Sequence, residues 1–163
     1  MERHERSAFS LPVAGKAMHT AFDGGRLTSD AGVLVLTEIE RRLGIAERLA
    51  RCIVDPRAPA RVHHTLAEMI RFRVLLIAAG YPDANDCDAL RADPAFKIAV
   101  GRPPESESDL CSQPTMCRLE NLPGTTALKR MMAAMIELDR FHRSSLRQLR
   151  AGAGPDRARH RRH

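Results

Sequence analysis

The stretch LAEMIRFRVLLIAAG, Leu66 to Gly80, decides the fold class of this chain. Apolar residues cover most of the helical circumference of this segment, which predicts a helix that other elements surround on nearly every side. Thr65 and Glu68 form a capping box, in which Thr65 accepts from the amide of Glu68 and Glu68 binds back to the amide of Thr65. We therefore expect a central, most buried helix that stops at Gly80.

Helical patterns continue on both sides of this segment. Aromatic residues make up only 4% of the chain and Trp is absent, so the core must rest on aliphatic side chains, which favours helices over β-sandwiches. The first expected helix begins after Thr28 or Ser29 as the cap and stops at Gly44, and its inner face carries Val33, Leu36, Ile39, Glu40 and Leu43. Shorter helices are expected over 45–53, from Asp83 or Asn85 to about 92, over 94–101 and over 112–121. The last helix begins at Thr125 or Thr126 and has an apolar stripe made of Leu128, Met131, Met132, Met135 and Leu138. The predicted fold is mostly α, with at most a short hairpin near 22–27 around the Asp23-Gly24-Gly25 turn.

The charge of the chain is distributed unevenly. The formal net charge is +6, but from Arg140 onward eight arginines face one acid, a net of +7, and the remainder has a net charge of −1. The sequence therefore predicts three parts: an irregular N-terminal arm over 1–20, a helical domain over 21–139, and a disordered Arg-rich tail over 140–163. The neutral body argues against strong DNA binding by the domain itself.

The residues that most often carry chemistry form no recognisable site in the sequence. Asp83, Asp86, Asp88 and Asp93 lack the spacing of a calcium loop and suit helix starts, and the four cysteines lack zinc-site spacing. His63 and His64 point different ways and lack a third ligand, so they are expected to be solvated or to cap a helix. We expect no catalytic, metal or small-molecule site and, without a leader or a membrane-length apolar run, no membrane partner and a cytoplasmic protein.

The segment SQPTMCRLEN, Ser112 to Asn121, has the composition of a helix that reads a DNA groove. Gln113 can pair with adenine, Thr115 with a phosphate or a thymine methyl, and Arg118 with guanine or phosphate. The eleven-residue linker before it is too long for a helix-turn-helix turn, and an ordinary amphipathic helix remains the alternative. Arg71 and Arg73 are further candidate phosphate contacts, with surface or ion-paired arginine as the alternative.

Three segments together resemble the amino-terminal region of a known family. The runs FDGGRLTSDAGVLVLTEIERRLG (22–44), DPRAPARVHHTLAEMIRFRVLLIAAGYPDANDCDALRADPAFKIAVGR (55–102) and SQPTMCRLEN (112–121) look like bacterial insertion-sequence transposases of the DDE-type group 1. The resemblance covers roughly 21–138, and the second and third runs are the most specific.

The resemblance implies a helical region that helps to bind the ends of the element, followed by a ribonuclease-H-like domain. Acidic residues of that later domain bind two divalent metal ions, such as Mg²⁺, and drive strand cleavage and transfer. We expect this chain to lack that domain, to need no cofactor of its own and to be inactive in catalysis. Its expected partners are the terminal repeats of the element and the full-length transposase.

The last residues have a second interpretation at the level of the gene. Codons allowed for PDRARHRRH (Pro155 to His163), shifted by one base, encode a run that resembles the family's first catalytic strand, RIVLDIDD. The hypothesis is that the chain is a truncated transposase whose tail, from a point between Leu138 and Ala151, is out-of-frame translation. The alternatives are a small DNA-binding regulator that competes with full-length transposase, and a remnant that folds poorly. The nucleotide sequence beyond the stop codon tests the hypothesis.

Overall fold

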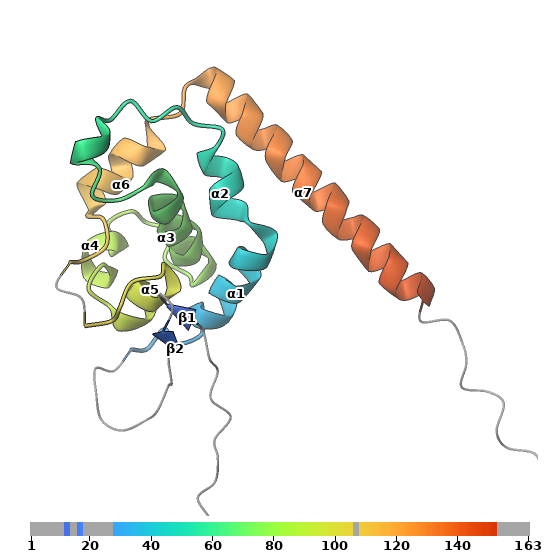
Figure 1. Cartoon of the computed structure of the whole chain (residues 1–163), viewed down its shortest axis with the longest axis horizontal. Helices are drawn as coiled ribbons and strands as arrows, with labels where there is room; N and C mark the ends of the chain where they lie inside the picture. Colours follow the sequence, from blue (N-terminus) through green and yellow to red (C-terminus); the bar gives the residue numbers. More distant parts are fainter. Residues whose placement is uncertain (1–11, 14–15, 18–27, 106–107, 153–163) are drawn as a thin grey trace, which may run out of the picture.

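The computed structural model describes residues 12–13, 16–17, 28–105 and 108–152, and these form a mostly helical protein, as the sequence predicts (Figure 1). The elements, in chain order, are β1 (Pro12–Val13), β2 (Lys16–Ala17), α1 (Val33–Leu43), α2 (Ile45–Ala50), the 3₁₀ turn η1 (Pro59–Arg61), α3 (Leu66–Ala78), α4 (Asp86–Leu90), α5 (Pro94–Ala99), α6 (Gln113–Glu120) and α7 (Thr125–Gly152).

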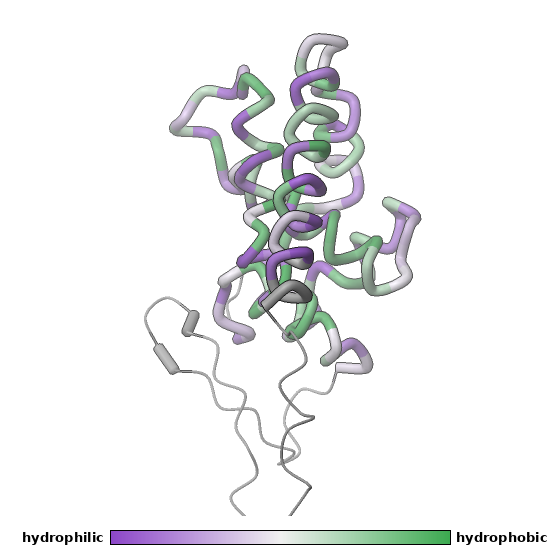
Figure 2. Tube along the Cα trace, turned by 90° about the vertical axis from the view of Figure 1, so that its right-hand side faces the viewer, coloured by the Kyte–Doolittle hydropathy of each residue, from purple (hydrophilic) through white to green (hydrophobic). Residues whose placement is uncertain are grey.

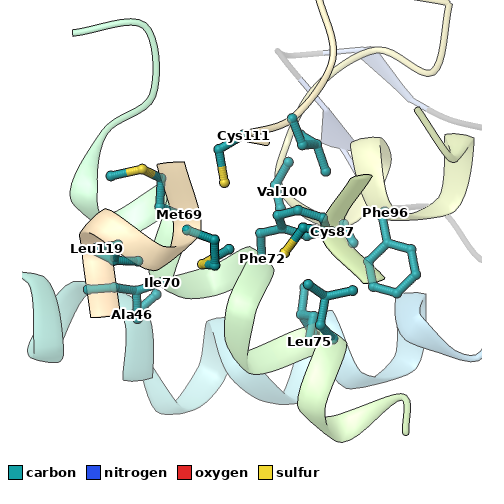
Figure 3. Close-up of a cluster of buried hydrophobic side chains, with 14 of the residues drawn as sticks. Ala46, Met69, Ile70, Phe72, Leu75, Cys87, Phe96, Val100, Cys111 and Leu119 are labelled. Carbon is teal, nitrogen blue, oxygen red and sulfur yellow. The ribbon is translucent and has the colours of Figure 1, made fainter. Parts of the chain in front are cut away.

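Helix α3 is the centre of the core, which confirms the expectation from its apolar circumference. It packs against α1, α2, α5 and α6. Phe72 and Leu75 are each 1% exposed, and the ring of Phe72 meets the edge of Phe96 from α5 at a centroid distance of 5.8 Å. Figure 3 shows these side chains with Cys87 from α4 and Leu119 from α6 gathered around α3. The core is therefore one cluster to which six helices contribute.

A turn at Gly44 joins α1 to α2. Gly44 has φ +63°, a left-handed conformation that glycine adopts without steric cost, and its amide bonds to the carbonyl of Glu40. The buried face of α1 contains Val33 and Glu40 of the predicted face and also Thr37, whereas Ile39 of the predicted face is 50% exposed. The spacing places Glu40 on the inner face, but it does not show that Arg71 of α3 binds the Glu40 carboxylate there.

Two predicted caps are only partly right. The N-cap position of α1 is Gly32, and Thr28 instead donates to Oδ1 of Asp93 at 3.1 Å, so it links the chain before α1 to the start of α5. At α3, Thr65 accepts from the amide of Glu68 at 3.1 Å as predicted. The carboxylate of Glu68, however, is bound to His64 and Arg102.

The predicted acidic starts fit the helices better. Asp93 caps α5, because its Oδ1 accepts from the amides of Ala95 (2.8 Å) and Phe96 (3.2 Å). Asp88 accepts from the amide of Gln113 at 3.0 Å, so its charge lies at the positive end of α6. Both acids therefore serve the role that the sequence assigns to this group.

The N-terminal strands are a finding that the sequence does not predict. β1 and β2 pair antiparallel, with Pro12 opposite Ala17 and Val13 opposite Lys16, inside the arm expected to be irregular. The hairpin predicted near 22–27 lies outside the described residues.

Helix α7 is much longer than the others and leaves the body. The sequence places the end of the helical domain at residue 139, whereas α7 continues to Gly152. It begins beside α2 and then diverges from α1 and α2, so its C-terminal half lies apart from the body (Figure 1). Of its predicted apolar stripe, Leu138 is buried and Met131 packs against the core, while Leu128, Met132 and Met135 are exposed.

Candidate nucleic-acid interface

Helix α6 has one face in the core and one face in solvent. Met116 is fully buried and Leu119 is 6% exposed, so these two residues hold the helix against the body. Arg118 lies on the outer side and is exposed, and among the described residues it has no hydrogen-bond or ion-pair partner. The predicted helix therefore exists and presents at least one free cation.

The other two predicted residues of α6 are less accessible than Arg118. The side-chain amide of Gln113 donates to the sulfur of Cys117 at 3.2 Å, one turn later. The hydroxyl of Thr115 is bonded to the hydroxyl of Ser112 at 3.2 Å. Both side chains are half-buried. A base or a phosphate has to replace these local bonds before it can bind either residue.

Arg71 is directed into the body. Its Nε donates to Oε2 of Glu40 at 2.7 Å, and its second terminal nitrogen binds the carboxylate of Glu47. Burial disfavours the charged guanidinium, but the hydrogen bonds and charges of Glu40 and Glu47 outweigh burial and raise the pKa of Arg71. The structure thus places Arg71 where it joins α3 to α1 and α2.

Arg73 connects α3 to α6. Its Nε lies 2.6 Å from Oε1 of Glu120, and its Nη2 donates to the carbonyl of Pro82 at 2.9 Å. The side chain is 17% exposed. Because Glu120 is the last residue of α6, this pair fixes the C-terminal end of that helix. The structure does not bring Arg71, Arg73 and Arg118 together on one surface as free charges.

Two polar clusters were not predicted from the sequence. The Glu68 carboxylate lies 2.7 Å from Arg102 Nη2 and 3.0 Å from His64 Nδ1, which ties the start of α3 to the chain that follows α5. Lys97, 2% exposed, lies with its Nζ 3.2 Å from Asp109. Both clusters fasten the linker between α5 and α6, so they position α6 on the body. Their partners are far apart in sequence, and periodicity carries no signal for such pairs.

The positive charge of the described chain is concentrated on α7. Residues 28–124 contain 12 basic and 14 acidic residues, a net charge of −2. Helix α7 contains six basic and two acidic residues, a net charge of +4. Lys129, Arg130, Arg140 and Arg147 are exposed and have no partner among the described residues. This helical surface was not expected, because residues from 140 onward were assigned to a disordered tail; the Arg, Leu and Gln residues beyond that point, which are good helix formers, were the available signal.

The described residues contain no group of three or more His, Cys, Asp or Glu side chains that could hold a metal ion. In the same part of the chain, no helix is both long enough and apolar enough to cross a bilayer.

A family model matches most of the chain. The family model described as "Transposase DDE domain group 1" matches residues 11–149. No curated protein and no solved structure matches the chain. The matched range includes the whole of α6 and α7 up to Leu149, so both candidate surfaces lie within it.

Proposed function

The chain belongs to the DDE group 1 transposase family, and from this membership we propose that its helical region binds DNA at the ends of an insertion sequence. In this proposal the region recognises and holds the element ends. Strand cleavage is the work of the ribonuclease-H-like domain that the family resemblance implies, through metal ions bound by acidic residues of that domain. The family match carries the proposal, because it makes DNA the expected partner.

The exposed surfaces of α6 and α7 support different roles in this proposal, and α6 suits precise recognition. Helix α6 is held rigidly by Met116 and Leu119 in the core and by the Arg73–Glu120 pair at its end, and a rigid element is what precise recognition requires. Arg118 is the residue of α6 that is free to bind a base edge or a phosphate. We propose Arg118 as the contact, and Gln113 and Thr115 as residues that bind DNA after giving up their local bonds.

Arg71 and Arg73 enter the proposal as positioning residues. Their guanidinium groups are already bound to Glu40, Glu47 and Glu120, and a phosphate has to displace a carboxylate to bind them. Their role is to keep α3 and α6 in place, and a loss of DNA binding on their removal is expected to come with a loss of stability.

The proposal is tested by DNA binding of the full chain to duplexes that carry the terminal repeats, compared with scrambled duplexes of equal length. We expect tighter binding to the terminal repeats. Arg118→Ala should weaken that binding by a factor of roughly five or more, equivalent to about 1 kcal/mol for a lost base or phosphate contact. Arg48→Ala on α2 is the matched control, because Arg48 is also exposed and makes no ion pair among the described residues. Equal affinity of the unmodified chain for both duplexes contradicts the proposal.

A second measurement addresses catalysis. Incubation of the chain with labelled element-end DNA and Mg²⁺ or Mn²⁺ is expected to give no cleaved strand and no strand-transfer product. Metal-dependent cleavage by the purified chain shows that it performs the chemistry itself and contradicts the assignment of binding alone.

A further inference from the structure

We infer that α7 presents a straight line of three cations, Lys129, Arg140 and Arg147, which binds the sugar–phosphate backbone of duplex DNA. This inference rests on the proposed DNA-binding function and names the surface that makes the main electrostatic contact. The occupant is a duplex, because its backbone offers phosphates along the whole length of a line of exposed, unpaired cations.

The spacing of the three residues aligns them along the helix axis. Lys129 and Arg140 are eleven residues apart, and Arg140 and Arg147 are seven apart. With about 3.6 residues per turn, these separations leave all three within about 20° of one line. Lys129 and Arg147 are eighteen residues apart, about five full turns, so the line is ~27 Å long. A duplex of that length carries about sixteen phosphate charges.

The line faces away from the body. Met131 packs against the core and Leu138 is buried, and these two residues lie about 180–200° around the helix from Lys129. Met131 therefore holds the helix to the body on its buried side, and the three cations lie on the opposite side of the helix. Figure 2, viewed from the side on which α7 lies, shows hydrophilic and hydrophobic residues alternating along it. Nothing in the described chain covers the outer side of the line.

The three cations are also unpaired. Each is exposed, and none has a hydrogen-bond or ion-pair partner among the described residues. Arg143 on the same helix differs, because its Nε lies 2.8 Å from Asp139. Glu137 and Asp139 are the acidic residues of α7, and both lie about 80° to either side of the line. A solvated helix face that serves only solubility usually mixes both signs in pairs, whereas the line itself holds no acidic residue.

Among the described residues, the surplus of positive charge lies on α7. The body over 28–124 has a net charge of −2, and Asp88 lies at the start of α6, where its carboxylate repels a phosphate. Helix α7 has a net charge of +4. Neutralising phosphates requires cations that displace counterions, so within the described residues we assign the backbone contact to α7 and the more selective contact to α6.

The test measures how the DNA affinity of the full chain depends on salt. The variant Lys129→Gln/Arg140→Gln/Arg147→Gln removes the line with a good helix former at each position. If all three residues bind phosphates, the slope of log Kobs against log salt becomes less steep by about 2.7, at about 0.9 per contact. Affinity should fall by the same factor on terminal-repeat and scrambled duplexes, because backbone contacts carry no sequence information.

Two controls remove the same charge elsewhere. The variant Arg48→Gln/Arg51→Gln/Arg61→Gln removes three exposed arginines of the body, and Arg157→Gln/Arg159→Gln/Arg161→Gln removes three arginines near the C-terminus. Each control variant should change the slope by less than the ~0.9 that one phosphate contact contributes. Within α7, Arg130→Gln is the control for Lys129→Gln, since Arg130 is exposed and unpaired in the described chain but lies about 100° off the line.

The outcomes separate this inference from the proposed function. If the unmodified chain binds no DNA, the proposed function fails. If it binds and the α7 triple variant keeps the original slope, or if either control triple loses as much, the line is not the phosphate contact. Tighter, line-dependent binding of polyglutamate than of duplex DNA assigns the surface to an acidic protein and overturns the inference. Circular dichroism of each variant verifies that the helices are retained.

Discussion

The guanidinium of Arg71 donates from Nε to Oε2 of Glu40 at 2.7 Å, and Glu40 is 2% exposed. The second oxygen of the same carboxylate accepts from the amide of Ala46 at 2.8 Å. One buried glutamate therefore joins α1, the start of α2 and α3. It occupies a position that the apolar spacing of α1 assigns to the core, and it belongs there because both of its oxygens are bound.

Replacement of Glu40 by Ala should destabilise the protein strongly. The change leaves the Ala46 amide without its acceptor and Arg71 with only Glu47, and breaking a buried pair costs about 3 kcal/mol or more. Chemical denaturation followed by circular dichroism measures the free energy of unfolding. Glu137→Ala on the exposed side of α7 is the control and should leave the midpoint unchanged. An unchanged midpoint for Glu40→Ala shows that the pair is not needed.

The edge-on contact between Phe72 and Phe96 should make Phe96→Ala costly. Phe96 is fully buried and its ring also meets Tyr81 at a centroid distance of 6.4 Å, so its removal leaves a cavity between α3 and α5. Loss of a buried phenylalanine costs about 3–5 kcal/mol. Phe141→Ala removes the same side chain from a site that is 68% exposed on α7 and should cost far less. Similar thermal midpoints for the two variants would falsify this packing.

The cap at Asp93 predicts a graded pair of variants. Asp93→Ala removes the acceptor of two amides at the start of α5 and of the Thr28 hydroxyl, and should lower the free energy of unfolding by about 1–2 kcal/mol. Asp93→Asn keeps an acceptor oxygen and should recover most of that loss. If Asn is as harmful as Ala, the charge of Asp93 rather than its hydrogen bonds stabilises the helix.

The cysteines should differ in reactivity. Burial raises the pKa of Cys87 to about 11 and that of Cys111 to about 12, so both thiols stay protonated and shielded at neutral pH. Cys52 and Cys117 are half-buried and should react first with a thiol reagent, while Cys87 and Cys111 should react only after denaturation. Mass spectrometry of labelled peptides reads the order. Labelling of Cys111 at the rate of Cys52 in the native protein contradicts the packing.

The same two thiols predict a direction of pH dependence. In the unfolded chain their pKa returns to an ordinary value near 9. Above that pH the unfolded chain releases protons that the folded chain still holds, so the free energy of unfolding should fall as the pH rises from 9 towards 11 or 12. Below pH 9 these thiols should add no pH dependence. Denaturation of a Cys87→Ala/Cys111→Ala variant, compared with the unmodified chain over that interval, isolates their contribution.

Local signals in the sequence predicted the elements well. The stops at Gly44 and Gly80, the cap at Asp93 and the central place of α3 all follow from residues adjacent in the chain or from one helical period. Such signals can be interpreted without the tertiary structure, because a helix end and its cap are made by the same few consecutive residues. The family resemblance is confirmed by the family model, which matches residues 11–149.

The site was harder to predict because its residues depend on distant partners. Nothing in the sequence around Arg71 and Arg73 distinguishes them from free cations. Only the tertiary structure shows that carboxylates from α1, α2 and α6 bind these two arginines. Burial of Lys97 depends on Asp109 across a loop, which helical periodicity cannot show. Arg118 is a candidate from the sequence, and it is also exposed in the structure. Its contact with DNA stays a prediction.

The three cations of α7 are aligned only while the number of helical residues between them stays the same. An inserted or deleted residue between Met131 and Leu138 leaves the charge and the helix propensity almost unchanged, yet it turns Lys129 by about 100° from the two arginines. It also turns Met131, which contacts the core, away from the buried Leu138, so the buried side of the helix is split as well. Substitutions along α7 can therefore be absorbed one at a time, whereas changes in its length act on anchoring and on charge alignment together.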